Sequence, residues 1–393
     1  MNIHEYQSKD LLAGFGVRIP RGGLAYSPEQ AAYRAREIGG SAWVVKAQIH
    51  SGGRGKAGGV RLCDSEQAVY SAAEDLFGKR LITNQTGERG KVVYRVYVEG
   101  VISIKQELYL GFVFDRKSER IMVVASRYGG QEIEVIASAQ QESIVRSVVE
   151  PAVGMQAFQA REIGFALGVE HESISELVQV ILGCYQAFEK FDATMVEINP
   201  LVVADDGNLY ALDAKMMFDD NALFRHPEIS ELRDKSQEDA IESQAADRGL
   251  GYLGLDGNIA CVANGAGLAM ATIEMLQHHG GKAACFVDIG GGASPEKVAK
   301  AIRLACSAPH VDAMLINVFA GINRCDTIVE GIQMAVDKQS LDIPTVVRLA
   351  GNEVASGRKL LAQSGLPLIR ANTLDEAAQR VVMAIKATAN TAK

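Results

Sequence analysis

The sequence lacks the features that mark membrane, secreted or nucleic-acid-binding proteins. It contains no run of 18 apolar residues, so we expect no membrane-spanning helix. Residues 1–5 have neither the basic nor the apolar character of a secretory leader, which favours a cytoplasmic protein. With 40 Lys and Arg against 48 Asp and Glu, the formal charge is −8. This acidic balance argues against a nucleic-acid partner, which would normally require a basic surface.

Cysteine and histidine are scarce and are not arranged as metal ligands or nucleophiles. The 6 cysteines include no C-x-x-C pair, so we expect buried thiols in a reducing compartment rather than disulfides or a zinc site. The 7 histidines show no metal-ligand spacing. Neither residue type forms an evident pair with a base. The sequence therefore reveals no nucleophile for covalent chemistry.

The length of 393 residues and the hydrophobic content of 48% indicate two or three domains, each with its own core. Residues 1–238 mix helices and strands, with long amphipathic stretches near 155–168 and 172–190. The polar, acidic segment 226–248 predicts an exposed crossing into a second domain, 239–393. There, five apolar runs alternate with helical stretches, at 258–263, 283–289, 311–319, 343–349 and 367–370. This alternation predicts an α/β fold with a doubly wound parallel sheet behind an α+β front half.

Lys46 is unusual because it interrupts an apolar, strand-like run, residues 42–49. A buried ammonium group is costly unless an anion meets it. The following loop, 52–59, holds five glycines with Arg54 and Lys56, a composition that suits phosphate oxygens. A mobile hairpin tip with a locally paired Lys46 is the alternative, because the loop matches neither established glycine-rich phosphate motif.

A second candidate site lies on a predicted hairpin. The extended segments 194–203 and 208–216 flank the turn signal at 205–207. If the turn centres on Asp206, the numbers of paired residues sum to 412, which places Asn199 opposite Asp213. Glu197 then shares their face, because side chains alternate along a strand. These oxygen ligands would suit Mg²⁺, unless the polar face is simply solvated.

Three glycine-rich turns follow successive strands of the second domain, at 264–267, 290–295 and 319–324. Ligands of open parallel sheets collect at the carboxyl ends of the strands. Tight turns between strands and helices are the commoner use of glycine. Three such turns at one sheet edge favour a binding rim, whose ligand the sequence does not identify.

These motifs, together with residues 2–7, 221–225 and 288–293, resemble those of one family along essentially the whole chain. The family comprises the β subunits of ADP-forming succinyl-CoA synthetase and malate–CoA ligase. The resemblance implies an ATP-grasp domain in front, at 1–238, and a flavodoxin-like CoA-ligase domain behind, at 239–393.

The resemblance also implies roles for individual residues. Residues expected to hold ATP are Lys46, Gly53, Arg54, Gly55, Glu99, Ile102 and Glu107. Those expected to bind Mg²⁺ are Asn199 and Asp213, and the expected catalytic carboxylate is Glu197. The acid substrate is expected to contact Asn264, Gly321, Ile322 and Asn323.

In this family phosphate passes from ATP to a histidine and then to the acid, before the thiol of CoA displaces it. The resemblance places that histidine and most of the CoA site on an α subunit, in an αβ or (αβ)₂ assembly. This arrangement would explain why no nucleophile is evident in the present chain.

The substrate prediction depends on two short segments, 319–325 and 348–351. They read Phe-Ala-Gly-Ile-Asn-Arg-Cys and Arg-Leu-Ala-Gly, where succinate enzymes commonly read Phe-Gly-Gly-Ile before Arg-Cys and Arg-Leu-Glu-Gly. Both forms favour malate, and the amide of Asn323 would suit a substrate hydroxyl that succinate lacks. A succinate–CoA ligase of the citric acid cycle is the alternative.

Two further functions fit part of the pattern. A non-catalytic nucleotide-binding subunit would be expected to lack Lys46, Glu197 or Asp213, and all three are present. A dinucleotide-dependent oxidoreductase would share the parallel sheet. That class is disfavoured because the G-x-G-x-x-G fingerprint with its following acidic residue is missing.

Overall fold

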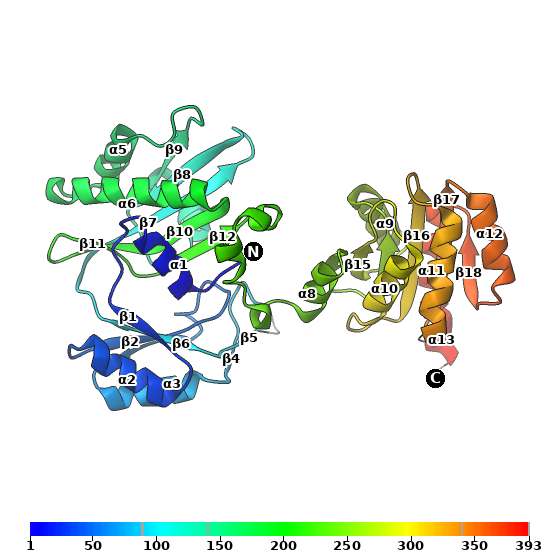
Figure 1. Ribbon diagram of the computed structural model, residues 1–393, viewed down its shortest axis with the longest axis horizontal. Helices are drawn as coiled ribbons and strands as arrows, with labels where there is room; N and C mark the ends of the chain where they lie inside the picture. The colour runs from blue at the N-terminus through cyan, green and yellow to red at the C-terminus, as the bar shows by residue number, and fades with distance from the viewer. Residues whose placement is uncertain (88–89, 140, 339–340, 392–393) are drawn as a thin grey trace. The chain divides into compact units, whose positions relative to one another are not determined.

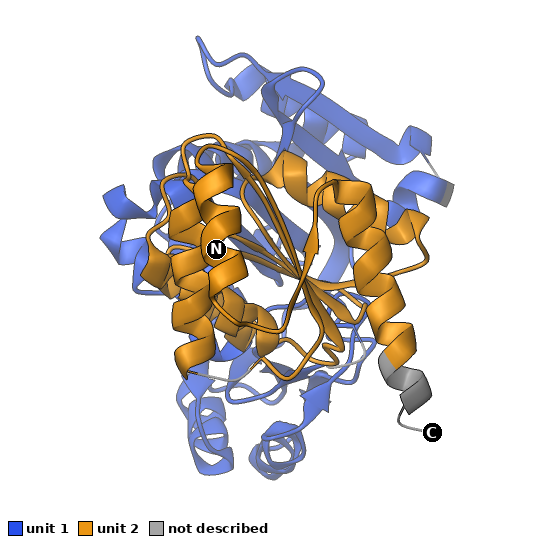
Figure 2. Cartoon of the chain, turned by 90° about the vertical axis from the view of Figure 1, so that its right-hand side faces the viewer, with its two compact units in different colours: residues 1–237 blue, residues 238–393 orange. Residues whose placement is uncertain are grey.

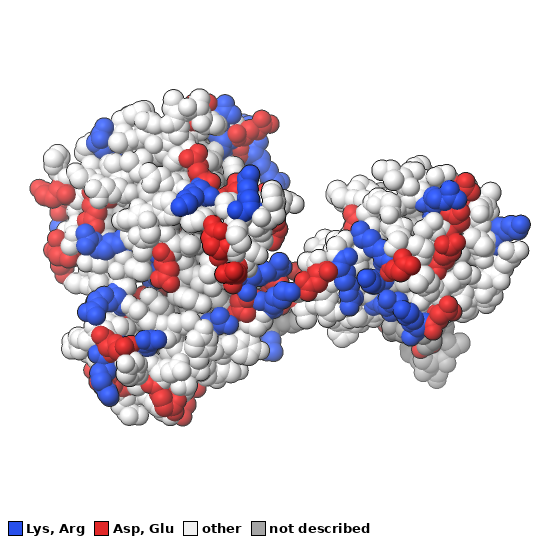
Figure 3. All heavy atoms as spheres, viewed as in Figure 1, with Lys and Arg blue, Asp and Glu red and all other residues white. Residues whose placement is uncertain are grey.

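The structure, a computed structural model, describes residues 1–87, 90–139, 141–338 and 341–391. The chain divides into two compact units, residues 1–237 (unit 1) and 238–393 (unit 2), shown in separate colours in Figure 2. Among the described residues, no helix has the length and apolar character needed to cross a membrane. On the face of unit 1 shown in Figure 3, basic and acidic side chains are interspersed.

The first part of unit 1 is a four-stranded antiparallel sheet ordered β1-β6-β2-β3. Its strands are β1 (Gly22–Ala25), β2 (Trp43–Ala47), β3 (Val60–Cys63) and β6 (Val96–Gly100). Two helices cover it, α2 (Pro28–Ile38) and α3 (Glu66–Leu76) (Figure 1). Serine caps begin both helices: the Ser27 hydroxyl accepts from the Gln30 amide, and the Ser65 hydroxyl accepts from the Ala68 amide.

The second part of unit 1 is a six-stranded antiparallel sheet ordered β11-β10-β7-β8-β9, with β12 also paired to β10. Its strands are β7 (Ile104–Asp115), β8 (Arg120–Ser126), β9 (Ile144–Val149), β10 (Ala193–Ala204), β11 (Leu209–Ala211) and β12 (Ala214–Phe218). The predicted amphipathic stretches form α5 (Ala157–Leu167) and α6 (His171–Lys190), which bury their apolar faces on this sheet (Figure 1). The first helix, α1 (Glu5–Ala13), packs beside β12.

The predicted register of the β10 hairpin is confirmed. Leu201 pairs with Ala211 and Ile198 with Ala214, so the numbers of paired residues sum to 412. Between these pairs, the amide of Asn199 donates to the carbonyl of Asp213 at 3.0 Å. A slip of one residue would have turned these side chains to the opposite face.

Unit 2 is a doubly wound sheet with helices on both faces (Figure 2). The strand order is β13-β15-β14-β16-β17-β18, and all neighbouring strands are parallel except β13 and β15. The strands are β13 (Gly251–Gly254), β14 (Ile259–Ala263), β15 (Ala283–Asp288), β16 (Ala313–Ala320), β17 (Thr345–Gly351) and β18 (Leu368–Ala371). Five of these strands confirm the five predicted apolar runs, whereas the antiparallel edge strand β13 was not predicted.

The helices of unit 2 divide between the two faces of its sheet. One face packs against α10 (Pro295–Cys306), α11 (Cys325–Lys338), α12 (Val354–Gln363) and α8 (Ala240–Asp247). The other packs against α9 (Ala266–His278) and α13 (Leu374–Thr391). The prediction that 226–248 is only an exposed crossing is wrong for α8, because Ala245 of that helix is buried in the core of unit 2.

The remaining elements of the described chain are short. They are β4 (Arg80–Leu81), β5 (Lys91–Val92), α4 (Ile133–Ala139) and α7 (Pro227–Ser230), with 3-10 turns at Gln141–Ser143, Asp220–Arg225 and Lys235–Gln237.

Candidate functional site

A cavity of about 160 Å³ in unit 1 gathers several of the predicted site residues. Both the glycine-rich loop after β2 and the hairpin of β10 and β12 line it. The predicted residues that line it are Gly53, Arg54, Glu197, Asn199 and Asp213. Other lining residues include Glu5, His50, Gln85, Glu132 and Glu134. Elements far apart in the sequence therefore place a glycine-rich loop opposite the predicted metal ligands.

Lys46 is buried, and carboxylates meet its ammonium group. The side chain is only 7% exposed. Its Nζ forms ion pairs with Glu99 and, at 3.1 Å, with Glu5, and it donates to the Leu212 carbonyl at 2.6 Å. The interaction with Glu5 joins β2 to the N-terminal helix, so Lys46 is not a locally paired strand residue.

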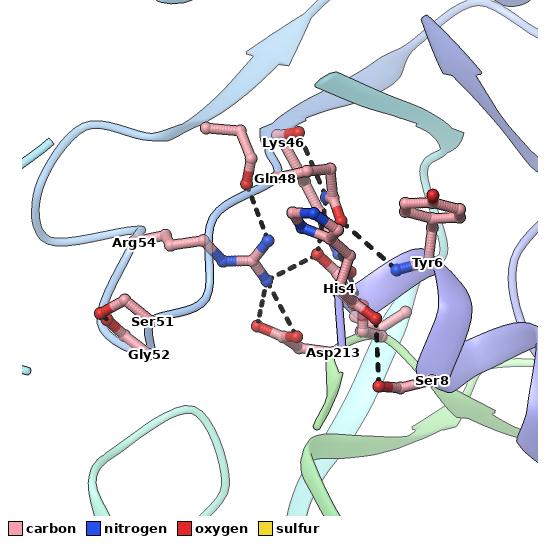
Figure 4. Close-up of polar contacts among 12 residues, drawn as sticks. His4, Tyr6, Ser8, Lys46, Gln48, Ser51, Gly52, Arg54 and Asp213 are labelled. Carbon is pink, nitrogen blue, oxygen red and sulfur yellow. Dashed lines mark hydrogen bonds and ion pairs between the residues drawn. The ribbon is translucent and has the colours of Figure 1, made fainter. Parts of the chain in front are cut away.

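Arg54 connects the glycine-rich loop to the hairpin. Its Nη2 donates to both carboxylate oxygens of Asp213 at 2.9 Å and contacts Glu5 at 2.6 Å (Figure 4). Its Nη1 donates to the carbonyl of Ala47 at 2.8 Å. The Arg54 side chain is 5% exposed, so the loop carries a buried, oriented cation rather than a solvated one.

Lys9 completes a buried cluster of alternating charges. Its Nζ lies 2.9 Å from Glu5 and 2.6 Å from Glu99, and the side chain is fully buried. Burial alone would raise the pKa of Glu5, but Arg54, Lys46 and Lys9 together hold it well below its ordinary value. Glu5 is therefore charged at neutral pH and holds the three cations in place.

The hairpin presents the donor types that Mg²⁺ prefers. Asp213 supplies a carboxylate, and Asn199 supplies an amide oxygen on the neighbouring strand of the same cavity. The Asn199 amide also bridges to the loop after β8, accepting from the Gly130 amide and donating to the Gln131 carbonyl, both at 2.8 Å. Among the described residues, no cluster of three or more His, Cys, Asp or Glu side chains could hold a metal ion. The donor set thus fits a cation that takes most of its ligands from phosphates and water.

Glu197 lies on the cavity wall, opposite Lys215 in the hairpin register. Burial raises the pKa of its carboxyl group, and the charges of Asp213 and Glu134 raise it further. Lys215 and Asn199 act in the opposite direction. A carboxyl group with a raised pKa inside a cleft is a candidate for an active-site role.

Other predicted ATP residues do not line this cavity. Glu99 is buried and forms ion pairs with Lys46 and Lys9. Gly55 forms part of the loop's internal turn, accepting from the Gly58 amide at 3.0 Å. Ile102 follows β6, and Glu107 lies on β7 opposite Val202. The assignment of these residues to a nucleotide site stays a prediction.

Glu5, Lys9 and His50 are site residues that the sequence reasoning missed. Glu5 contacts both predicted phosphate-binding cations, and His50 lines the cavity. The sequence signals were the motif at 2–7, which contains Glu5, and the i,i+4 spacing of Glu5 and Lys9, which on most helices marks a solvated pair.

In unit 2, side chains link the three glycine-rich turns to one another. The Asn264 amide accepts from the Phe319 amide at 3.0 Å and donates to the Phe319 carbonyl at 2.8 Å. One carboxylate oxygen of Asp288 accepts from the amides of Gly265 and Gly290, at 2.8 and 2.7 Å. The three turns therefore form one cross-linked rim at the carboxyl ends of β14, β15 and β16, as their positions predicted.

Asn323 is a further link in this rim. Its side chain accepts from the Ala293 amide at 2.8 Å and donates to the Gly290 carbonyl at 2.7 Å. It is 2% exposed, whereas the neighbouring Ile322 is 84% exposed and Gly321 also lies at the surface. Both polar groups of Asn323 are thus engaged by backbone in this structure, and its contact with a substrate hydroxyl stays a prediction.

The two units match known domain families. A model of the ATP-grasp domain matches residues 2–203, and a model of the CoA-ligase family matches residues 262–382. The order of these domains defines the class as ATP-grasp CoA ligases, and the chain belongs to that family. The fold class predicted from the sequence is confirmed.

Full-length relatives place the chain among the β subunits of this class, which confirms the resemblance. It is 59% identical over 389 residues to the probable malate–CoA ligase subunit beta of Mesorhizobium japonicum, covering 99% of each chain. It is 48% identical to the succinate–CoA ligase [ADP-forming] subunit beta of Paramagnetospirillum magneticum, covering 98% of this chain and 99% of that one. The corresponding subunit of Bacillus subtilis is 47% identical, with coverage of 97% and 99%.

A solved structure supports the fold over the same length. The ATP citrate lyase of Methanothrix soehngenii, in complex with citrate and coenzyme A, matches with a TM-score of 0.75. The match covers 98% of this chain and 99% of that one at 18% sequence identity, so it bears on the fold alone.

Proposed function

We propose that the chain is the β subunit of an ADP-forming acid–CoA ligase that joins a four-carbon dicarboxylate to CoA. The overall reaction converts ATP, the acid and CoA to ADP, phosphate and the acyl-CoA. Malate is the favoured acid and succinate the alternative. The observation that carries this proposal is the full-length identity of 59% to a probable malate–CoA ligase β subunit.

In this proposal unit 1 binds Mg²⁺ and ATP. Lys46 and Arg54 would contact the phosphates, and Asn199 and Asp213 would hold the metal, which neutralises phosphate charge when bound. The buried cluster supports these roles because Lys9, Lys46 and Arg54 balance Glu5, Glu99 and Asp213. Because the cluster is already balanced, the negative charge of the ATP phosphates would be offset by the positive charge of Mg²⁺. Arg54 would then contact both Asp213 and the phosphates.

The phosphate acceptor in this proposal is a histidine of an α subunit, which also binds most of the CoA. Of the histidines that the structure describes, His50 alone lines the cavity. Burial and the neighbouring His4 lower the pKa of His50 to about 3, so its imidazole is neutral at physiological pH. Glu197 would orient the incoming histidine, and the rim of unit 2 would hold the acid.

We also infer that the protein works in the cytoplasm. All six cysteines are free thiols, and five of them are buried. Free, buried thiols are typical of proteins from reducing compartments.

The test is co-expression of the chain with its cognate α subunit. We expect the purified complex to release ADP in the presence of CoA and malate, and labelled phosphate from ATP to appear on α. Label on this chain that disappears in a His50→Asn variant would instead make His50 the acceptor. Turnover by the isolated chain would contradict the need for α. Activity with succinate but not with malate would reject malate as the substrate. Native mass measurement of the complex distinguishes αβ from (αβ)₂.

A further inference from the structure

A cavity of about 160 Å³ lies between α10 and α11 of unit 2. The described residues that line it are Glu296, Ala299, Lys300, Arg303, Met334 and Lys338. Three of these side chains are cations and one is a carboxylate, so the lining carries a net charge of +2. Basic side chains also gather over these two helices on the face of unit 2 that Figure 3 shows. Such a surface is unusual in a chain whose formal charge is −8.

The three cations of the cavity have no carboxylate partner. Among the ion pairs of the described residues, none involves Lys300, Arg303 or Lys338. Arg303 is half-buried, and its Nη1 is shielded from solvent without a hydrogen bond to any described residue. A buried donor that is left unpaired costs about 1–3 kcal/mol. The guanidinium of Arg303 therefore has hydrogen-bonding capacity that the fold itself does not use.

Glu296, the one carboxylate of the lining, does not neutralise these cations. It lies one turn before Lys300 on α10, a spacing at which two side chains can interact, yet the two form no ion pair. Hydrogen bonding by the Ser294 hydroxyl is the main cause that lowers the pKa of Glu296, and the charge of Lys300 contributes less. The carboxylate is thus engaged mainly by the cap of its own helix, and the cavity keeps its positive charge.

The lining indicates the class of ligand. Ala299 is buried and Met334 is half-buried, so the wall between the charges is apolar, which strengthens the attraction of an anion. Lys300 and Arg303 come from one helix and Lys338 from the other, so the cations approach an anion from two sides. A phosphate group presents oxygens in several directions, and a monoester carries a charge of about −1.5 to −2 at pH 7. Its shape and charge therefore match the lining better than those of a single carboxylate.

The cavity is separate from the rim of glycine-rich turns. No described residue of the turns at 264–267, 290–295 or 319–324 lines it. At a rise of 1.5 Å per residue, Arg303 lies about 13 Å along α10 from Ser294, and Lys338 lies about 20 Å along α11 from Cys325. An anion held by Arg303 and Lys338 would therefore not be the acid substrate on the rim.

We propose that the cavity between α10 and α11 binds a phosphate group, either as inorganic phosphate or as the phosphate of a small metabolite. Arg303 would donate hydrogen bonds to its oxygens, and Lys300 and Lys338 would supply the remaining positive charge. This site goes beyond the proposed function and does not depend on it. A carboxylate of the α subunit is the competing occupant, and the experiment separates the two.

The experiment titrates the full-length chain with inorganic phosphate at constant ionic strength, using isothermal titration calorimetry. Arg303→Gln removes the guanidinium and should weaken binding about tenfold or more. Glu296→Gln removes only a repelling charge and should tighten binding by up to about fivefold. Phosphate that binds elsewhere in the chain contributes equally to all proteins, so the differences between them assign the site. Opposite effects of two substitutions in one cavity would not arise from a general loss of structure.

The matched control is Arg370→Gln, which changes an exposed arginine on β18 and should bind phosphate as the wild type does. Unchanged affinity in both Arg303→Gln and Glu296→Gln would overturn the proposal. Acetate, a planar monoanion, should bind less tightly than phosphate, and equal binding of the two anions would also overturn it. If Arg303→Gln is unfolded by circular dichroism, Lys300→Gln takes its place with the same expected direction.

Two further titrations identify the source of the phosphate and exclude the partner. Glycerol 3-phosphate binding more tightly than inorganic phosphate would assign the phosphate of a metabolite, and the reverse order would assign the free ion; either result supports the site. The purified complex with α should show the same difference between wild type and Arg303→Gln as the chain alone. Loss of this difference in the complex would show that α covers the cavity, which would overturn the proposal.

Discussion

At the scale of single residues, the charge balance of the buried cluster in unit 1 depends on Lys9. Its ammonium group forms ion pairs with Glu5 and Glu99, the two carboxylates that Lys46 also contacts. We predict that Lys9→Met lowers the free energy of unfolding by about 3–5 kcal/mol, because Glu5, Glu99 and Asp213 would then share only Lys46 and Arg54, which leaves the cluster with one uncompensated negative charge. Urea unfolding measures this change. Lys79→Met, at an exposed lysine, should change stability by less than about 0.5 kcal/mol, and equal effects of the two variants would contradict the prediction.

Asp213 is the residue on which the metal assignment depends. Its carboxylate lies on the cavity wall within reach of Arg54. We predict that Asp213→Ala abolishes the Mg²⁺-dependent transfer of phosphate from ATP to the α-subunit histidine, because the metal loses its charged ligand. Labelled ATP added to the complex measures the transfer. Asp75→Ala, at an exposed position on α3, should transfer phosphate normally, and retained transfer by Asp213→Ala at low Mg²⁺ would reject the assignment.

At the scale of elements, the rim of unit 2 depends on side chains that connect successive turns. Asp288 ends β15 and holds the turns at 264–267 and 290–293 together through two backbone amides. We predict that Asp288→Ala raises the KM for the acid several-fold without reducing phosphorylation of α, because only unit 2 loses order. Asp288→Asn keeps one acceptor oxygen and should have a smaller effect. Equal losses in both half-reactions would show instead that the whole subunit is destabilised.

The β10 hairpin shows how an element carries a site. Its turn sets the register, and the register places Glu197, Asn199 and Asp213 on one cavity wall. The alternation of the sequence was sufficient to predict this arrangement, because a hairpin forms between neighbouring segments whose pairing the turn fixes. The parallel strands of unit 2 were predicted for a related reason: each is a short apolar run between amphipathic helices.

At the scale of the whole molecule, the chain consists of two units with separate cores. Every residue of the two cores of unit 1 lies between Ile3 and Ile229, and every residue of the two cores of unit 2 lies between Ala245 and Val382. We therefore predict that a fragment of residues 1–239 folds alone and binds Mg·ADP with a Kd within about tenfold of that of the full chain. Isothermal titration calorimetry with the fragment measures this affinity. A fragment that is folded by circular dichroism but does not bind would show that the nucleotide site needs unit 2.

The sequence by itself determined the domain order, the five parallel strands, the hairpin register and the family. These features depend on periodicity and on motifs, which are properties of neighbouring residues. Only the tertiary structure decided that Glu5 and Lys9 join the buried charge cluster with Lys46 and Arg54, and that the Asn323 amide serves the backbone of another turn. The physical reason is the same in each case. A buried polar or charged group takes its partner from whatever the fold brings within hydrogen-bond distance, and that partner is usually far away in the sequence.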